Sequence, residues 1–169
     1  MNNTEQLIER LVLSIETLTE KLSQALPQPL SAPDWSAAVA WRYRKRASGH
    51  GSLEPVQHVS NLKLDDLKEI DVQKEKIARN TEHFVNGLPA NNVLLTGARG
   101  TGKSSLIKAC LNAFTDKGLR LIEVDKADLV DLSDIVDITA ERSEKFIVFC
   151  DDLSFEDGES SYKALKSVL

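Results

Sequence analysis

The amino-acid sequence predicts an α/β fold with a parallel sheet, because short apolar runs alternate with helical segments along the chain. Apolar runs of about five residues predict buried strands, and longer stretches with apolar residues at every third or fourth position predict helices. From residue 92 the expected order is strand, helix, strand, helix, strand, which is typical of parallel sheets. We expect strands over 92–96, 119–124 and 146–150, and helices over 71–86, 103–116, 134–142 and 160–169.

Composition places the chain among globular proteins. Of its 169 residues 41% are hydrophobic and 28% charged, and its net charge of -5 argues against a surface devoted to nucleic acid. No apolar run approaches the roughly 18 residues needed to cross a bilayer, and the N-terminus has no signal-peptide pattern. Cys110 and Cys150 lie in apolar segments. We therefore expect a cytoplasmic protein with reduced thiols and no membrane contact.

The N-terminal segment predicts an amphipathic helix over 4–25. Its apolar residues are spaced three and four apart, which draws one stripe along the helix. This stripe either packs on the chain's own domain or pairs with a second copy as a short coiled coil. A proline-rich linker over 27–33 ends the helix. The stripe consists of Ile8, Leu11, Ile15, Leu18, Leu22 and Ala25.

A basic and aromatic segment follows the linker. Asp34 is expected to cap a helix over 35–44. Cations interleaved with aromatic side chains suit nucleic acid, since cations meet phosphates and aromatic rings stack on bases. The alternative is a solvated face whose aromatic rings are tucked against the domain. The residues are Trp41, Arg42, Tyr43, Arg44, Lys45 and Arg46. We divide the chain into 1–26 (helix), 27–52 (linker and basic helical segment) and 53–169 (nucleotide-binding core).

A phosphate-binding loop carries the strongest functional signal. The pattern G-x-x-x-x-G-K-[ST] lies between a predicted strand and a predicted helix, as its chemistry requires. Glycines let successive backbone N–H groups wrap around phosphates, and the helix that follows points its positive dipole end at the same anion. Lys103 is expected to reach the β- and γ-phosphates, and Ser104 to ligate Mg²⁺. The candidate nucleotide-binding residues are Gly97, Ala98, Arg99, Gly100, Thr101, Gly102, Lys103, Ser104 and Ser105.

Two carboxylates follow the last predicted strand. Open α/β sheets bind ligands at the carboxyl ends of their strands, and Asp151 lies at such an end. We expect Asp151 to hold Mg²⁺ and Asp152 to polarise the attacking water in catalysis together with Lys103. An acidic solvated turn is the alternative interpretation.

Two groups of segments resemble AAA+ ATPases. Segments 64–67 and 70–74 resemble the stretch that packs near adenine in those proteins. Segments 91–105, 121–126 and 149–156 are similar to a bacterial AAA+ family known as domain of unknown function 815. The resemblance covers roughly residue 41 to the end of the sequence.

The resemblance implies a five-stranded sheet in the order 5-1-4-3-2, of which strands 1, 2 and 3 are recognisable. Strand 4, the arginine finger and the helical lid are not, so we expect an N-terminal portion of a longer protein. Asp152 stands where AAA+ proteins at large carry Glu, which favours slow hydrolysis. Glu69 stands where relatives usually place Gly.

The leading functional hypothesis is an AAA+ type P-loop ATPase that uses ATP and Mg²⁺ to remodel or load a macromolecular partner, and that self-associates as an oligomer. Its chemistry would be transfer of the γ-phosphoryl group to water, although this chain alone is expected to bind nucleotide without efficient turnover. One alternative is a nucleotide-gated module that exchanges ATP and ADP and holds nucleic acid through Arg42–Arg46. Another is a small-molecule kinase, since kinases share the phosphate loop.

Overall fold

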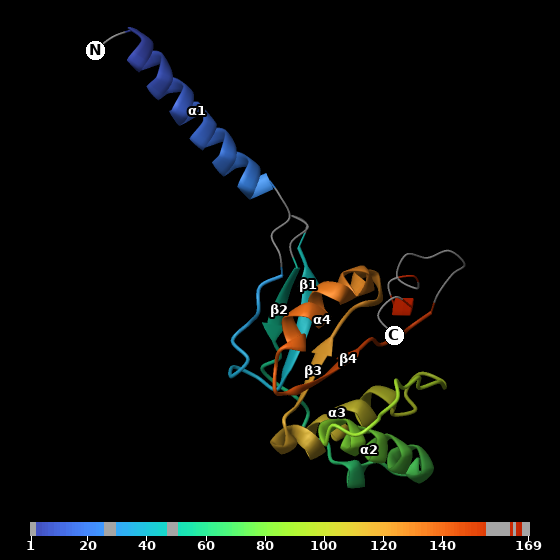
Figure 1. The fold of residues 1–169 in the computed structure, drawn as a ribbon. Helices are drawn as coiled ribbons and strands as arrows, with labels where there is room; N and C mark the ends of the chain where they lie inside the picture. Colours follow the sequence, from blue (N-terminus) through green and yellow to red (C-terminus); the bar gives the residue numbers. More distant parts are fainter. Residues whose placement is uncertain (1–2, 26–29, 47–50, 155–162, 164, 167–169) are drawn as a thin grey trace.

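The structure is a computed structural model that describes residues 3–25, 30–46, 51–154, 163 and 165–166 (Figure 1). The helix expected over 160–169 lies largely outside the described residues. Short 3-10 helices span Leu64–Asp66 (η1), Thr115–Lys117 (η2) and Lys126–Asp131 (η3). The helices are α1 (Asn3–Ala25), α2 (Asp71–Val85), α3 (Lys103–Phe114) and α4 (Leu132–Ala140), and the strands are β1 (Ala40–Lys45), β2 (Gly51–Pro55), β3 (Leu119–Glu123) and β4 (Lys145–Phe149).

Four strands form one sheet in the order β2-β1-β3-β4. β3 runs parallel to both β1 and β4, while β1 and β2 form an antiparallel pair. The predicted α/β class and the strands expected over 119–124 and 146–150 are confirmed, each within one or two residues. The parallel pairing of β3 with β4 also agrees with the neighbouring strands 2 and 3 that the resemblance implies.

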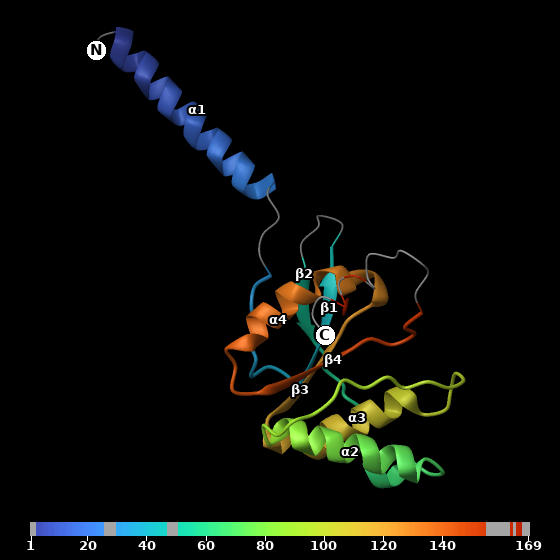
Figure 2. The ribbon, with the colours of Figure 1, turned by 45° about the vertical axis from the view of Figure 1, so that its right-hand side comes forward.

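Helices cover both faces of the sheet because its strands are apolar on both sides. On one face, Trp41 and Ile122 pack with Ile135 of α4. On the other, Leu121 packs with Leu111 of α3. α2 lies against α3 on the side away from the sheet, and Figures 1 and 2 show the two helices side by side. The result is a layered α/β body with a hydrophobic cluster on each face of the sheet.

The helix expected over 35–44 is wrong: residues 40–45 form β1. Trp41 and Tyr43 are buried while the arginines between and after them are more exposed, which is the period of two expected of a strand. Asp34 caps a turn instead, since its Oδ1 accepts hydrogen bonds from the N–H and hydroxyl of Ser36 (2.9 and 2.6 Å). The preference of the aromatic residues Trp41 and Tyr43 for a pleated sheet outweighs the local capping signal.

The buried strand expected over 92–96 is also wrong, because this segment has no regular secondary structure. Leu94 is 74% exposed and Val93 44% exposed. A strand is stable only beside another strand that takes up its backbone hydrogen bonds, and the described sheet ends at β4 without pairing with this segment. The residue before the segment is nevertheless held: the Asn91 N–H donates to Asn80 Oδ1 of α2 (2.9 Å), and Asn80 Nδ2 donates to the Asn91 carbonyl (2.8 Å).

α1 projects away from the layered body (Figures 1 and 2). Every α1 side chain whose exposure the structure describes is exposed, including the apolar stripe. The interpretation that the stripe packs on the chain's own domain is therefore wrong. Within the described residues, no helix is both long and apolar enough to cross a membrane.

Candidate functional site

The loop before α3 follows a path that few residues other than glycine adopt. Gly97, Gly100 and Gly102 all have positive φ, at 142°, 83° and 85°. A Cβ atom strains the backbone at such angles, whereas glycine, which has none, takes them at little cost. Gly102 is the N-cap of α3. The glycines of the motif are thus placed where the chain must turn back before the helix begins.

Lys103 folds its side chain over this loop. Its ammonium Nζ donates hydrogen bonds to the carbonyl oxygens of Gly97 (3.0 Å) and Ala98 (2.8 Å). The Thr101 hydroxyl closes the same loop by donating to the Ala98 carbonyl (2.9 Å). These contacts hold one positive charge against the carbonyl oxygens of the loop.

Ser104 and Asp151 come together from positions 47 residues apart in the sequence. The Ser104 hydroxyl, in the first turn of α3, donates to Asp151 Oδ2 at 2.7 Å. Asp151 follows the carboxyl end of β4, and its other oxygen, Oδ1, accepts a hydrogen bond from the Asp152 N–H (3.0 Å). The two residues that the sequence predicts as Mg²⁺ ligands are therefore neighbours, and the carboxylate is held at both oxygens.

A cavity of about 220 Å³ lies beside the loop. Apolar side chains and residues of the loop over 97–105 both line it, so an apolar ring and an anion could be held there together. It is lined by Ile70, Gln73, Leu95, Thr96, Gly97, Thr101, Gly102, Lys103 and Leu106. The lining residues Ile70 and Gln73 belong to segment 70–74, which the sequence associates with adenine only through its resemblance to AAA+ proteins.

Asp152 is placed differently from Asp151. Its φ is 51°, which is unusual for a residue with a side chain, although Asp tolerates it better than most. The side chain is exposed, and the described residues offer it no hydrogen bond or ion pair. Arg99 is likewise exposed, while Ser105 is half-buried in the first turn of α3. The structure thus joins Ser104 to Asp151 and places Lys103 over the loop, whereas the described residues give the side chains of Asp152 and Arg99 no hydrogen bond or ion pair.

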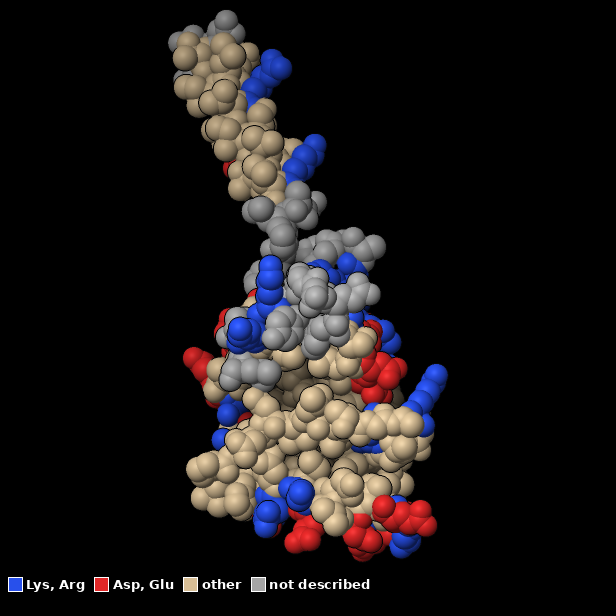
Figure 3. Space-filling view, turned by 90° about the vertical axis from the view of Figure 1, so that its right-hand side faces the viewer, with Lys and Arg blue, Asp and Glu red and all other residues tan. Residues whose placement is uncertain are grey.

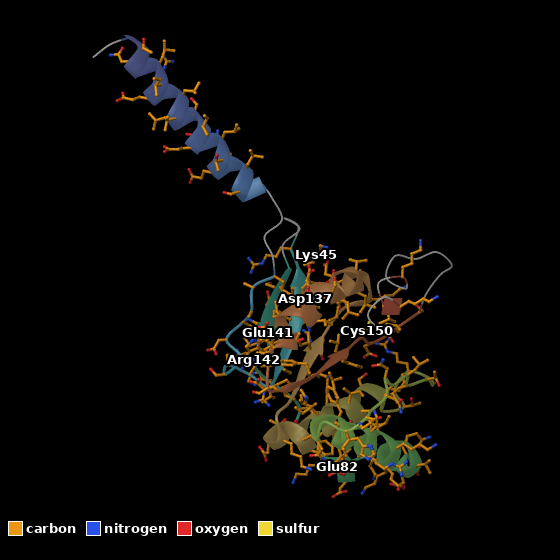
Figure 4. The ribbon with its side chains drawn as sticks, in the orientation of Figure 1. Lys45, Glu82, Asp137, Glu141, Arg142 and Cys150 are labelled. Carbon is orange, nitrogen blue, oxygen red and sulfur yellow. The ribbon has the colours of Figure 1, made fainter. Side chains whose placement is uncertain are left out.

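Cys150 lies immediately before these carboxylates, at the end of β4 (Figure 4). Burial raises the pKa of its thiol to about 11, and the charges of Asp125 and Asp151 add to the effect. The group is therefore a neutral thiol at physiological pH. Such a thiol packs as a small apolar residue.

The comparison with protein families gives one match, to the family described as "Protein of unknown function (DUF815)", over residues 36–169. That match covers most of the sequence. The chain belongs to the DUF815 family. The comparisons with curated proteins and with solved structures gave no match.

The DUF815 match contains the whole candidate site and all four strands of the sheet, but α1 lies outside it. The site is thus part of the domain that defines the family. α1 lies on the N-terminal side of the matched residues, so the family match says nothing about its role.

The basic segment lies within the residues that match DUF815, and three of its cations form ion pairs. Arg42 donates to Glu123 (2.9 Å), and Lys45 donates to Asp131 (2.8 Å). Arg44 makes a longer contact with Asp125 (3.4 Å). Figure 4 shows Lys45 near the end of β1.

The aromatic residues of the same segment are part of the core. Trp41 is fully buried and Tyr43 is 2% exposed. The Tyr43 hydroxyl donates to Asp131 (2.9 Å), and burial together with that carboxylate raises the pKa of the phenol. The interpretation that the aromatic rings are tucked against the domain is confirmed, and neither ring is free to stack on a base.

No cluster of three or more His, Cys, Asp or Glu side chains suited to a metal ion occurs in the part of the chain that the structure describes. This is compatible with Mg²⁺ bound to a nucleotide, because Mg²⁺ is usually held by one or two carboxylates together with phosphates and water. Ser104 and Asp151 have the chemistry for such a site: one hydroxyl and one carboxylate, each an oxygen ligand.

Proposed function

We propose that this chain binds Mg²⁺–ATP at the loop over 97–105, as the nucleotide-binding core of an AAA+ type P-loop ATPase. The observation that carries the proposal is the 2.7 Å hydrogen bond between the Ser104 hydroxyl and Asp151 Oδ2. In P-loop NTPases a Ser or Thr of the loop and an Asp at the end of a strand together hold the metal. Ser104 and Asp151 would hold Mg²⁺ through these oxygens, directly or through water, and the ion would offset charge on the phosphates.

Charge at the loop supports the same ligand. The first turn of a helix leaves backbone N–H groups without intrahelical acceptors, and here these groups belong to the start of α3. Lys103 adds a full positive charge beside them. A phosphate group would accept the hydrogen bonds that the ammonium now makes to carbonyl oxygens, which are weaker partners for a cation.

The cavity beside the loop supports a nucleoside rather than phosphate alone. Ile70, Leu95 and Leu106 border it with apolar surface. Because its volume of about 220 Å³ is small for a nucleoside triphosphate, the phosphates would extend from it along the exposed loop. The base would then lie between segment 70–74 and the start of α3.

The proposed role of Asp152 is in hydrolysis. Asp152 would orient water against the γ-phosphate, and its side chain is free to do so because no described residue holds it. Asp is one methylene shorter than the Glu usual in AAA+ proteins, so we expect slow turnover. In the same proposal the ATPase cycle acts on a macromolecular partner and the protein self-associates, as the resemblance to AAA+ proteins implies.

The proposed Mg²⁺ site can be tested with a double-mutant cycle on Ser104→Ala and Asp151→Asn. Nucleotide affinity is measured by calorimetry with Mg²⁺ and with a chelator. Each single variant should lose most of the Mg²⁺-dependent gain in affinity, and the double variant should lose little more, because both residues serve one ion. Asp137→Asn, an exposed change of the same charge on α4 (Figure 4), should retain the full gain.

A Mg²⁺-dependent gain that survives in both single variants would refute the assignment of these ligands. Nucleotide binding that is absent from the folded wild type would refute the proposal as a whole.

Nucleic-acid binding through Arg42–Arg46 is not favoured by the observations above. Its three best-placed cations already face carboxylates, and both aromatic rings are buried. A phosphate backbone would have to displace Glu123 and Asp131 to reach them.

A further inference from the structure

The helix α1 carries an apolar stripe that no other described element covers. Five of its side chains are between 52% and 63% exposed, although each would be more stable out of water. They are Ile8, Leu11, Ile15, Leu18 and Leu22. Figure 3 shows non-charged side chains over much of the visible face of α1. A surface of this kind on a projecting helix fits a partner helix of matching pattern.

The spacing of the stripe selects the kind of partner. Alternating steps of three and four residues give a heptad whose a positions are Ile8, Ile15 and Leu22 and whose d positions are Leu11 and Leu18. Two of the three a residues are β-branched. β-Branched residues at a with Leu at d favour two parallel strands over higher oligomers. A second copy of the same helix offers this pattern in register.

The residues that flank the stripe favour a parallel arrangement. Leu7 precedes the a residue Ile8, and Val12 follows the d residue Leu11; both are exposed, at 60% and 47%. In a parallel pair, side chains five residues apart at these two flanks face each other across the seam, so Leu7 of each copy would contact Val12 of the other. An antiparallel pair would instead place Leu7 toward the far end of the second helix.

Charge does not oppose this pairing. Among the flanking positions whose side chains the structure describes, Lys21 is the one charged residue, with Ser14 and Thr19 at the others. Glu9, Arg10, Glu16 and Glu20 lie at outer positions of the heptad, where water can reach them. Like charges therefore do not meet across the seam.

We propose that α1 pairs in parallel with α1 of a second copy of this chain, as a short two-stranded coiled coil. The pairing tethers two α/β bodies at the same end of the helix pair and raises the effective concentration of one body near the other. The pairing involves neither the phosphate loop nor nucleotide, so its test is independent of the test of the proposed function.

Sedimentation velocity of the full chain without nucleotide, over about a hundredfold range of concentration, tests the association. Leu11→Asp should give a monomer where the wild type is a dimer. Leu13→Asp is the matched control: Leu13 is 62% exposed against 63% for Leu11, but it lies about 200° further round the helix. It should leave the dimer intact.

A wild type that stays monomeric over the whole range would overturn the proposal, as would equal loss of the dimer in both variants. The second result would show that the helix as a whole matters and the seam does not. A larger oligomer sensitive to Leu11→Asp would overturn the two-stranded form.

The direction of pairing is tested by oxidising Ile8→Cys. In a parallel pair the two introduced thiols face each other at one layer and should form a cross-linked dimer readily. In an antiparallel pair they would lie roughly 20 Å or more apart and should not cross-link. The wild type, whose Cys110 is buried and Cys150 half-buried, gives the background.

Discussion

Glu69 occupies a backbone conformation that disfavours its own side chain. Its φ is 62°, in the left-handed region. Neither a hydrogen bond nor an ion pair holds its carboxylate among the described residues, so nothing in that part of the chain compensates for the strain. The same position usually carries Gly in the AAA+ proteins that this sequence resembles. We predict that Glu69→Gly stabilises the protein.

The size of the effect follows from two opposing terms. A non-glycine residue in the left-handed region costs roughly 1–2 kcal/mol, which Gly avoids. Gly in turn loses about 0.5–1 kcal/mol more conformational entropy on folding. The net gain in the free energy of unfolding is about 0.5–1 kcal/mol. A gain of about 1 kcal/mol raises Tm by about 2–4 °C for a chain of this size.

Thermal unfolding followed by circular dichroism measures this gain. Glu75→Gly is the matched control, because Glu75 is also exposed but lies inside α2. There the same substitution should lower stability by about 0.5–1 kcal/mol, since Gly is a poor helix residue. A gain in stability for Glu69→Gly together with a loss for Glu75→Gly would support the left-handed conformation of residue 69. A loss of stability in Glu69→Gly as large as in Glu75→Gly would refute the left-handed conformation of residue 69.

Three further predictions concern the layered body. Burial raises the pKa of Asp128, with Asp125 and Asp131 adding to it, so its charged form destabilises the fold. Asp128→Asn should raise Tm at neutral pH, and the gain should vanish below about pH 3.9, where Asp is protonated in the unfolded chain too. Cys150, whose pKa is raised to about 11, should react with iodoacetamide at pH 8 roughly a hundredfold more slowly than an ordinary thiol. Gly51→Ala should lower stability by about 1–3 kcal/mol, because a Cβ there would overlap the Tyr43 hydroxyl.

Each of these has a contrary result that is simple to observe. A Tm gain in Asp128→Asn that persists at acid pH would mean that charge is not its cause. Rapid labelling of Cys150 in the folded protein, at the rate seen in denaturant, would contradict its burial. A neutral Gly51→Ala would mean that Tyr43 does not fill the space beside β2.

The sequence predicts the elements whose local signal and tertiary role agree. α2 and α3 have both helical periodicity and a partner on which to pack, and β3 and β4 are apolar on both faces because both faces are covered. The glycine loop is predictable for a different reason. Its residues are selected by backbone angles that only Gly adopts readily, so the pattern itself specifies the path.

The errors come from elements that depend on distant partners. Segment 92–96 has the composition of a strand, but a strand also needs a neighbour, and composition cannot supply one. The helix expected over 35–44 is wrong although Trp41 and Tyr43 alternate with arginines, a period-two signal present in the sequence. Its ion pairs with Glu123 and Asp131 join residues about 80 positions apart, which no local pattern reveals.

The residues of the candidate site also differ in whether their own sequence signals point to the site. Lys103, Ser104 and Asp151 were predictable because the loop motif and a strand end each have a known place in an α/β sheet. The contributions of Ile70 and Gln73 to the cavity were suggested only by the resemblance, since nothing in their own residue types points to a ligand.

The most direct test of the central proposal is Mg²⁺-dependent binding of a labelled ATP analogue to the wild type and to Lys103→Ala. Lys108→Ala serves as control, because it removes the same charge from the same helix one turn further on. We predict saturable binding in the wild type and in Lys108→Ala, and at least a tenfold loss of affinity, about 1.4 kcal/mol, in Lys103→Ala. Equal binding by all three folded proteins, or binding by none of them, would contradict the assignment of a nucleotide site to this loop.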